Sequence, residues 1–385
     1  MNLILTGNAT QALEFVDQNH VEAVVVGSEL PDMTGLRLLD LVFQHNPSVH
    51  RFLVVDADRR QSSRVSASIA HFLIRAPLSS SRLTASLDRA NQLTEWFGPG
   101  FATQILSRLR KIPSPPLPYF RALTELDSPE VSLEKLSATI AQHADLASKM
   151  MDMVNSPAFQ LPRPLASIDE VVRMLGMDAA TTMALVAHLF CQFNRISPYL
   201  FPLEGLRRHA LYTGRLARAL ARAERMPVDV QDRAFLAGLL HDAGKLLLAA
   251  NAPDTYGRIN AEIRFGFRSF TDVEREALGM SHAEVGAWLA GVWDLPMDVV
   301  AALAFHHEPR QLAKMPFSIP HIVHVANILA HQVQLDLPGG QVPQLDESML
   351  LKLGIAGRVQ EWSRLASNLV DPAEDVELSP RLVAA

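Results

Sequence analysis

The sequence has almost no thiol chemistry and no long uninterrupted apolar run. Cys191 is the only cysteine among 385 residues, which excludes an intramolecular disulfide and indicates a reducing compartment. The longest apolar stretch, Met177–Phe193, contains several polar residues, so we expect a buried helix there rather than a membrane span. The N-terminus has no basic region before an apolar core, which argues against a secretory signal. These absences predict a cytoplasmic protein without membrane contact.

An excess of basic residues is also lacking. The chain has 35 Lys and Arg against 41 Asp and Glu, and its formal net charge of −6 argues against broad nucleic-acid binding. We therefore expect no DNA partner. The sequence contains no Walker loop, Rossmann fingerprint, Cys-x-x-Cys pair or nucleophile elbow. With 48% hydrophobic and 20% charged residues it is an ordinary globular chain, long enough for two domains.

What is present falls into two parts that meet at a proline-rich segment. The first part alternates short aliphatic runs with helical spacing, which predicts a parallel sheet with strands at Leu3–Leu5, Ala23–Val26 and Phe52–Val55. The second part has helical spacing almost throughout. We predict a multidomain fold, α/β plus all-α, divided into an α/β domain at 1–100, a proline-rich linker at 101–118, a helical domain at 119–370 and a flexible tail at 371–385.

Helix signals are explicit at several positions. In the first part we expect helices at Ala9–Asn19, Gly35–Gln44 and Ser80–Phe97. In the second part, apolar spacing predicts one helix over Leu133–Val154. The tetrapeptide Ser281-His282-Ala283-Glu284 has the form of a capping box, which predicts a helix that begins there.

The α/β part resembles the receiver domains of response regulators. Residues 24–35, an aliphatic run followed by a loop with proline and glycine, are similar to the third receiver strand and its loop, and the resemblance covers roughly residues 1–95. Gly27 stands where this resemblance places the phosphoacceptor aspartate, and Ala76 stands where it places a lysine. An aspartyl phosphate requires a carboxylate nucleophile, so we expect no phosphorylation. We interpret this domain as a docking or dimerisation module.

The helical part resembles the HDOD family, whose members are relatives of the HD-domain phosphohydrolases. The resemblance covers about residues 112–335 and implies an HD-domain-like helical bundle with a role in bacterial signal transduction. Several motifs in the family's order carry it: Pro115–Pro118, Asn155–Phe159, Leu175-Gly176, the His-Asp motif within Leu240–Lys245, and the segment from His282 to Pro309.

The same resemblance implies a divalent metal site. Imidazole and carboxylate ligands suit Fe, Mn, Zn or Ni. Asn327 stands where the family's second aspartate is expected and brings no charge, and the Gly-Tyr-Pro signature of cyclic di-GMP phosphodiesterases is absent. The candidate ligands are His209, His241, Asp242, His282, His306, His307 and Asn327.

Three functions remain open from the sequence. The chain could signal through a protein partner or a second copy of itself, sense a nucleotide or cyclic dinucleotide, or act as a metal-dependent phosphohydrolase on such a compound. In an enzyme, Asp242 would be central and Lys245 would contact phosphate; Lys245 is equally explained as a solvated residue near a helix C-terminus. Four further histidines of this region are interpreted as core residues: His188, His321, His324 and His331.

Overall fold

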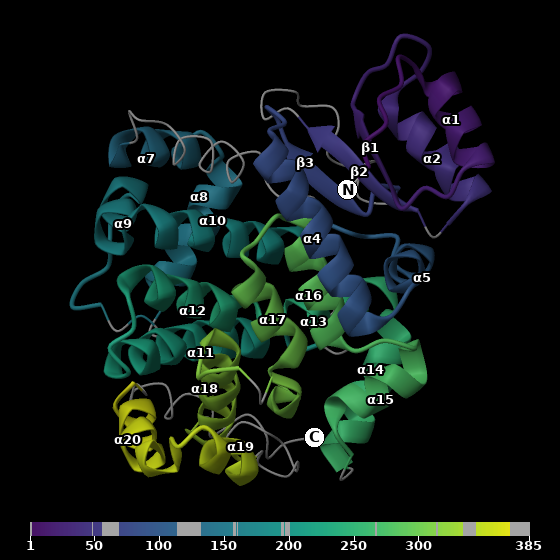
Figure 1. Ribbon diagram of the computed structural model, residues 1–385. Coiled ribbons are helices and arrows are strands. Elements are labelled where there is room, and N and C mark those ends of the chain that lie inside the picture. The colour runs from purple at the N-terminus through teal and green to yellow at the C-terminus, as the bar shows by residue number, and fades with distance from the viewer. Residues whose placement is uncertain are drawn as a thin grey trace. The chain divides into compact units, whose positions relative to one another are not determined.

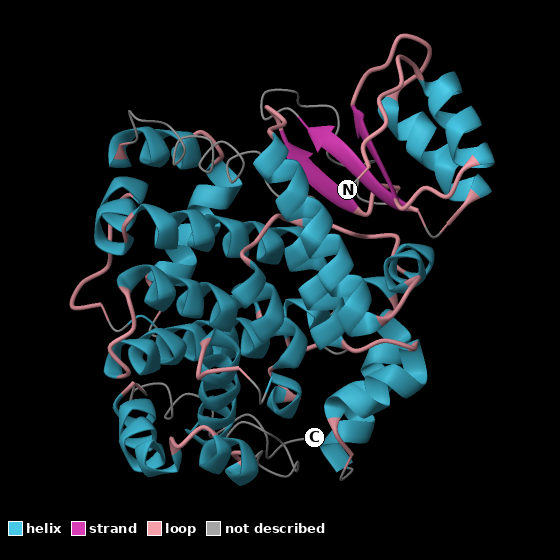
Figure 2. Cartoon of the chain, in the orientation of Figure 1, coloured by secondary structure: helices cyan, strands magenta, loops and turns pink. Residues whose placement is uncertain are grey.

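The computed structural model describes residues 2–47, 49–55, 69–113, 132–156, 159, 161–193, 196, 201–265, 268–312, 315–333 and 344–369. The chain forms two compact units, one of Met1–Phe120 with Trp288–Met297 and one of Arg121–Ala287 with Asp298–Ala385. Helices dominate, and the described strands form one sheet (Figure 2). No described helix combines the length and apolarity needed to cross a membrane. The predicted proline run 115–118, Pro157 and the tail 371–385 lie outside the described residues.

The first unit contains the sheet. Its three strands are parallel in the order β1-β2-β3, and Phe52 of β2 lies between Val25 of β1 and Phe72 of β3. Phe52 and Phe72 are buried and stack with their ring centroids 5.0 Å apart. The elements are β1 (Ala23–Gly27), β2 (His50–Val55), β3 (Phe72–Arg75), α1 (Ala9–Gln18), α2 (Gly35–His45), α4 (Ser80–Phe97) and α5 (Phe101–Arg108). Two of the predicted strands and all three predicted helices are thereby confirmed.

The strand predicted at Leu3–Leu5 is wrong. These residues have no strand partner among the described residues, and Leu3, Ile4 and Leu5 are 57%, 52% and 86% exposed. Aliphatic residues favour a strand only where a neighbouring strand can accept their hydrogen bonds and a core can cover their side chains. Neither condition holds for this segment in the part of the chain that the structure describes.

The loop after β1 is tied to two helix starts. The Asp32 carboxylate accepts hydrogen bonds from the backbone N–H groups of Ala9 and Thr10 at 2.9 and 3.0 Å, and so holds the first turn of α1. At the start of α2, a Cβ on Gly35 would lie 1.9 Å from the Gly27 carbonyl oxygen. Only glycine permits this approach, so the end of β1 and the start of α2 are in direct contact.

The second unit is wholly helical in its described part. Figure 1 shows α11 and α12 side by side with α18 next to them, and these three helices pack pairwise. Its elements are α7 (Leu133–Ala141), α8 (Ala144–Val154), α9 (Ile168–Leu175), α10 (Met177–Gln192), α11 (Leu203–Ala223), α12 (Val228–Leu240), α13 (Ala243–Asn251), α14 (Pro253–Phe265), α15 (Phe270–Leu278), α16 (His282–Val292, whose last residues belong to the first unit), α17 (Met297–Phe305), α18 (Ile319–Val333), α19 (Glu347–Lys352) and α20 (Val359–Asn368), with short 3₁₀ turns at Pro309–Leu312 and Ala356–Arg358.

The single helix predicted at Leu133–Val154 is two helices. α7 ends at Ala141, and His143 leaves the helical region with φ −114° and ψ 86° before α8 begins. Both segments bury one face, with Leu136 and Ile140 in α7 and Met150 in α8. Apolar spacing alone could not reveal the break, because the same spacing continues on both sides of it.

The predicted capping box at Ser281 is confirmed. The Ser281 N–H donates to Glu284 Oε2 at 2.7 Å, and the Glu284 N–H donates to Ser281 Oγ at 3.4 Å. This reciprocal pair satisfies two backbone donors that a helix start leaves without partners. It fixes the first turn of α16, where His282 is the first helical residue.

Candidate metal centre

The His241-Asp242 pair lies at the junction of two buried helices. His241 follows the last residue of α12 as its C-cap, and Asp242 precedes the first residue of α13 as its N-cap. His241 is fully buried and Asp242 is 3% exposed. A carboxylate buried to this degree needs a nearby positive charge or several hydrogen-bond donors. The side chains around it supply both.

Two histidines at helix ends share one hydrogen-bonding arrangement. His241 Nδ1 donates to the Gly238 carbonyl at 2.7 Å, and His306 Nδ1, directly after α17, donates to the Leu303 carbonyl at 2.8 Å. Because Nδ1 carries the proton, Nε2 of each neutral ring carries the lone pair. Both Nε2 atoms are buried without a hydrogen-bond partner among the described residues. Metal-ligating histidines are typically held in this way by a carbonyl on the opposite ring nitrogen.

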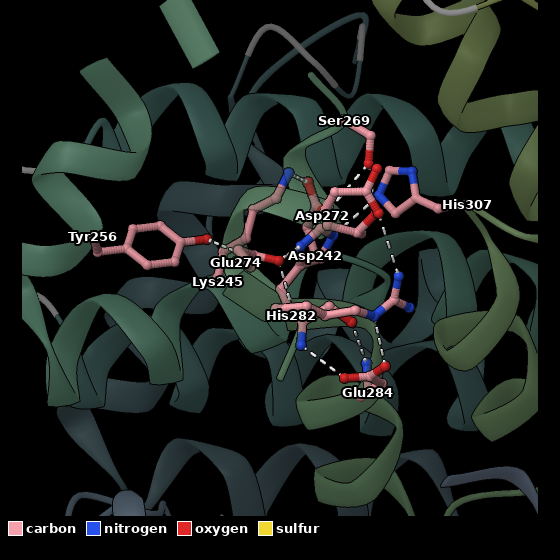
Figure 3. Close-up of polar contacts among 12 residues, drawn as sticks. Asp242, Lys245, Tyr256, Ser269, Asp272, Glu274, His282, Glu284 and His307 are labelled. Atoms are coloured by element: carbon pink, nitrogen blue, oxygen red, sulfur yellow. Dashed lines mark hydrogen bonds and ion pairs between the residues drawn. The ribbon is translucent and has the colours of Figure 1, made fainter. Parts of the chain in front are cut away.

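A third histidine is oriented by a buried carboxylate. His282 Nδ1 donates to Glu274 Oε2 at 2.6 Å, and the backbone N–H of His282 donates to the same oxygen at 2.8 Å. The Tyr256 hydroxyl donates to the other oxygen, Glu274 Oε1, at 2.6 Å. All three side chains are fully buried, and Figure 3 shows Tyr256 pointing toward Glu274, with His282 and Asp242 beside it. Glu274 therefore turns the Nε2 atom of His282 toward Asp242.

The two oxygens of Asp242 face different groups of side chains. Oδ1 lies 3.2 Å from His282 Nε2 and 3.7 Å from His306 Nε2. Oδ2 lies 2.7 Å from Lys245 Nζ and 3.4 Å from His241 Nε2. The potential ligand atoms form two groups, each with its members within 4.8 Å of one another: Asp242, His282, His306 and His307 form the first group, and His209, His241 and Asp242 form the second group.

The protonation states follow from burial and charge. Burial lowers the pKa of His306 to about 3, so this ring is neutral at ordinary pH. Burial alone would raise the pKa of Asp242, but the charge of Lys245 and the hydrogen bonds of its neighbours hold it well below the usual range. Asp242 is therefore an anion that faces the neutral imidazole of His306, and a carboxylate with an imidazole nitrogen is a donor combination that a transition metal prefers.

His209 of α11 differs from the other histidines. Its Nε2 lies 2.9 Å from Asn327 Oδ1 on α18, and since an amide oxygen only accepts, the imidazole donates here. The His331 ring stacks on the His209 ring with centroids 4.3 Å apart. His331 was predicted to be a core residue rather than a ligand, and it belongs to neither group of potential ligands among the described residues. Its position one helical turn beyond Asn327 places it on the same face of α18.

Comparison with known proteins identifies this helical region. Residues 112–309, slightly more than half of the chain, match the HDOD domain. The chain belongs to the HDOD family. The match excludes residues 1–111, so the receiver-like character of the N-terminal part stays a prediction.

Two relatives place the HDOD match in context. A protein of Treponema pallidum (strain Nichols), described only as uncharacterized, is 24% identical over 246 residues, which are 63% of this chain and 47% of that protein. The chain thus spans about half the length of this relative. A crystal structure of an HDOD domain protein of unknown function from Geobacter sulfurreducens has a TM-score of 0.50 and 20% identity, with coverage of 76% of this chain and 90% of that one. That likeness shows a shared fold.

Arg275 forms ion pairs with two glutamates at the edge of the HDOD site. Arg275 of α15 binds Glu284 of α16 through Nε at 2.9 Å and Glu308, next to His307, through Nη2 at 2.7 Å. Figure 3 labels Glu284 and His307 at this end of the site. These ion pairs connect α15, α16 and the segment after α17. They restrain His307, which is the exposed member of the first group.

Sequence reasoning missed three residues of this site: Tyr256, Glu274 and Arg275. Glu274 lies on the apolar side of α15 beside Val273, both buried. A charged residue on the buried face of an amphipathic helix is the signal that could have revealed it, because such a charge requires a partner. Tyr256 and Arg275 had no comparable signal, since both residue types are common on helix surfaces.

The other predicted positions are placed as follows. Lys245 is bound to Asp242 and covers the Phe270 ring, with Nζ 4.9 Å from the ring centroid. The predicted core histidines His321 and His324 are buried, and His324 Nδ1 donates to the His306 carbonyl at 2.8 Å. Gly27 lies at the end of β1 in the first unit and belongs to neither metal group.

Proposed function

We propose that the chain is a bacterial signal-transduction protein that acts through protein-protein interaction or ligand sensing rather than through catalysis. Membership of the HDOD family supports this role. The observation that carries the non-catalytic part is the Asn327 amide bonded to His209 at 2.9 Å. Because an amide brings no charge, Asp242 is the only anionic residue among the predicted ligands, which disfavours two tightly bound divalent ions.

The site would hold a divalent transition metal such as Fe, Mn, Zn or Ni. The buried Nε2 atoms of His241 and His306 and the Oδ1 atom of Asp242, which lack hydrogen-bond partners among the described residues, support this fit. A bound ion would supply positive charge able to polarise an oxygen-containing ligand.

The chain's own residues prepare this position in three ways. The carbonyls of Gly238 and Leu303 fix the tautomers of His241 and His306, and Glu274 fixes that of His282. Burial of these rings excludes water. Lys245, 14% exposed, places an ammonium group at the edge of the site, where it could contact a phosphate.

We further propose that residues 1–100 form a receiver-like docking or dimerisation domain, joined by the linker 101–118 to the HDOD domain 119–370 in a cytoplasmic protein. A phosphoacceptor is lacking because Gly27 has no side chain to carry the phosphoryl group. The contact between Gly35 and the Gly27 carbonyl supports a rigid surface at this end of the sheet. Partners would be a signalling protein or a second copy of the chain.

A second candidate function is hydrolysis of a nucleotide or cyclic dinucleotide by a metal-dependent phosphohydrolase. The observation that favours it is the position of Asp242, whose two oxygens face two separate groups of histidines. Lys245 would then bind the substrate phosphate, and Asp242 would be the central residue.

Metal analysis and hydrolysis assays separate the two candidates. For the signalling protein we expect metal in protein purified without chelators, and no hydrolysis of cyclic dinucleotides with added Mn²⁺ or Fe²⁺. Turnover that disappears in Asp242→Asn would overturn the non-catalytic proposal. Loss of the metal in Asp242→Asn without any turnover in the wild-type protein would support it.

A further inference from the structure

The two groups that share Asp242 differ in what their donor atoms already bind. In the first group, His306 Nε2 and Asp242 Oδ1 are buried and have no hydrogen-bond partner among the described residues. His282 Nε2 lies 3.1 Å from His307 Nε2 and 3.2 Å from Asp242 Oδ1. Three imidazoles and one carboxylate oxygen thus converge on one place. This is a complete set of four ligands for Zn²⁺ or a similar ion.

In the second group, two of the three potential ligands already bind other side chains of the protein. His209 Nε2 donates its proton to Asn327 Oδ1 and in this state has no lone pair to offer a metal. Asp242 Oδ2 is bound by Lys245 Nζ at 2.7 Å. Of the three members of this group, His241 alone directs an unengaged Nε2 toward it. One imidazole nitrogen is a poor ligand set for a divalent ion.

The Lys245 ammonium is held firmly in this position. It is paired with a buried carboxylate on one side and lies over the Phe270 ring on the other. With its side chain 14% exposed, its charge is only partly screened by water. A divalent ion at the second group would either displace the Lys245 ammonium group from Asp242 or be repelled by its positive charge.

We infer that each chain binds one metal ion, held by Asp242 Oδ1, His282, His306 and His307, and that Lys245 provides the positive charge at the second group in place of a second ion. This inference rests on the metal binding in the proposed function, and it concerns which residues bind the ion and how many ions are bound. In this inference, the role of the His209–Asn327 hydrogen bond is to join α11 to α18 and not to hold a metal.

Cobalt titration of the intact protein tests the inference. We expect one equivalent of Co²⁺ by dialysis and metal analysis, with the visible absorption of a four-coordinate ion. His307→Ala, a change at an exposed residue of the first group, should weaken binding by at least about tenfold, since it removes one of four ligands. His209→Ala removes one imidazole from the second group and should leave the Co²⁺ affinity and spectrum unchanged.

A double variant tests the role assigned to Lys245. Lys245→Met with Asn327→Asp removes the ammonium group and adds a carboxylate to the second group, so we expect a second equivalent of Co²⁺. Thermal unfolding followed by circular dichroism establishes that each variant is folded. If the double variant does not fold, the wild-type count and the comparison of His307→Ala with His209→Ala still decide the inference.

The outcomes are separable. Two equivalents in the wild-type protein, or loss of binding in His209→Ala but not in His307→Ala, would overturn the inference and leave the metal binding of the proposed function intact. A folded double variant that still binds one equivalent would overturn the role of Lys245. A wild-type protein that binds no Co²⁺ would overturn both the inference and the metal part of the proposed function.

Discussion

At the residue scale, the chemistry of the site is set by how a few buried charges are balanced. Asp242 and Glu274 are buried carboxylates, and Lys245 pairs directly with the first of them. Glu274 has no lysine or arginine among its hydrogen-bond partners in the described chain; its partners are Tyr256 and His282. His282 therefore lies between two negative charges, and its protonation state decides whether the metal-free site is neutral.

The first prediction concerns the pH dependence of metal affinity. Burial alone would lower the pKa of His282, but the charge of Glu274 raises it above its ordinary value of 6.5. A metal must displace the proton on Nε2, so we expect affinity to fall as pH falls below this raised pKa. Co²⁺ titrations at a series of pH values measure this. In Glu274→Gln the fall should occur at lower pH; an identical profile would contradict the assignment.

The second prediction concerns the stability contributed by Glu274. Glu274→Ala leaves the Tyr256 hydroxyl and His282 Nδ1 buried without their acceptor, so we expect a loss of about 3–5 kcal/mol in the free energy of unfolding. The matched control is Tyr256→Phe, which removes one hydrogen bond and should cost about 1 kcal/mol. Denaturant unfolding of metal-free protein measures both. Equal losses in the two variants would show that Glu274 does not hold His282.

Residue identity was only partly predictable. The histidines and Asp242 were identified because motifs in order pointed to them, and the structure brings Asp242, His282, His306 and His307 together. The direction of each ring was not predictable, since it depends on carbonyls and on Glu274 from other turns and helices. For the same reason, the sequence could not distinguish His209, which donates to Asn327, from the other histidines.

At the element scale, the approach of two helices sets the position of His282 relative to Asp242. A Cβ on Gly244 in α13 would lie 2.0 Å from the His282 carbonyl oxygen at the start of α16. The obstacle is backbone, which cannot rotate away as a side chain can. α13 and α16 must therefore separate if residue 244 carries any side chain.

The third prediction follows from this contact. Gly244→Ala should destabilise the protein by about 1–3 kcal/mol or more through overpacking, and should weaken Co²⁺ binding because Asp242 moves away from His282. Gly205→Ala in α11 is the matched control: the nearest atom to its Cβ is 3.9 Å away, and we expect stabilisation by about 0.4–1 kcal/mol. Thermal unfolding and Co²⁺ titration check both; a Gly244→Ala protein with wild-type stability would contradict the close packing.

Element boundaries were predictable where a local signal exists. The Ser281–Glu284 capping box predicted the start of α16. Gly176, with φ +80°, ends α9, and glycine is the residue most often found in this position after a helix. The break at His143 and the unpaired segment Leu3–Leu5 were missed. Both depend on what lies beside the segment in space, which periodicity does not contain.

At the scale of the whole molecule, binding of an ion to the folded state alone must stabilise the unit that holds it. The fourth prediction is that free metal at 100 times its dissociation constant adds about 2.7 kcal/mol to the free energy of unfolding of the helical unit. Calorimetry with and without Co²⁺ measures this, and a chelator should reverse it. His307→Ala, which should bind the ion at least about tenfold more weakly, should lose at least about half of the gain. A transition that Co²⁺ does not move would contradict binding to the folded protein.

The overall architecture was largely predictable, because strands and helices differ in hydrophobic period along most of this chain. A mostly helical protein with a small parallel N-terminal sheet follows from that difference. The assembly of the site was not predictable to the same degree. Its ligands come from positions 242 to 307, and only tertiary packing determines that these meet.

Each potential ligand of the first group stands at the end of a helix: Asp242 before α13, His282 at the start of α16, and His306 and His307 after α17. Helix ends have fewer backbone hydrogen bonds than helix interiors, so their positions are the most easily changed. An ion bound there would link the ends of α13, α16 and α17 through its ligands. Gain or loss of the ion would then change the angles between those helices, and a partner that contacts any one of them could detect it.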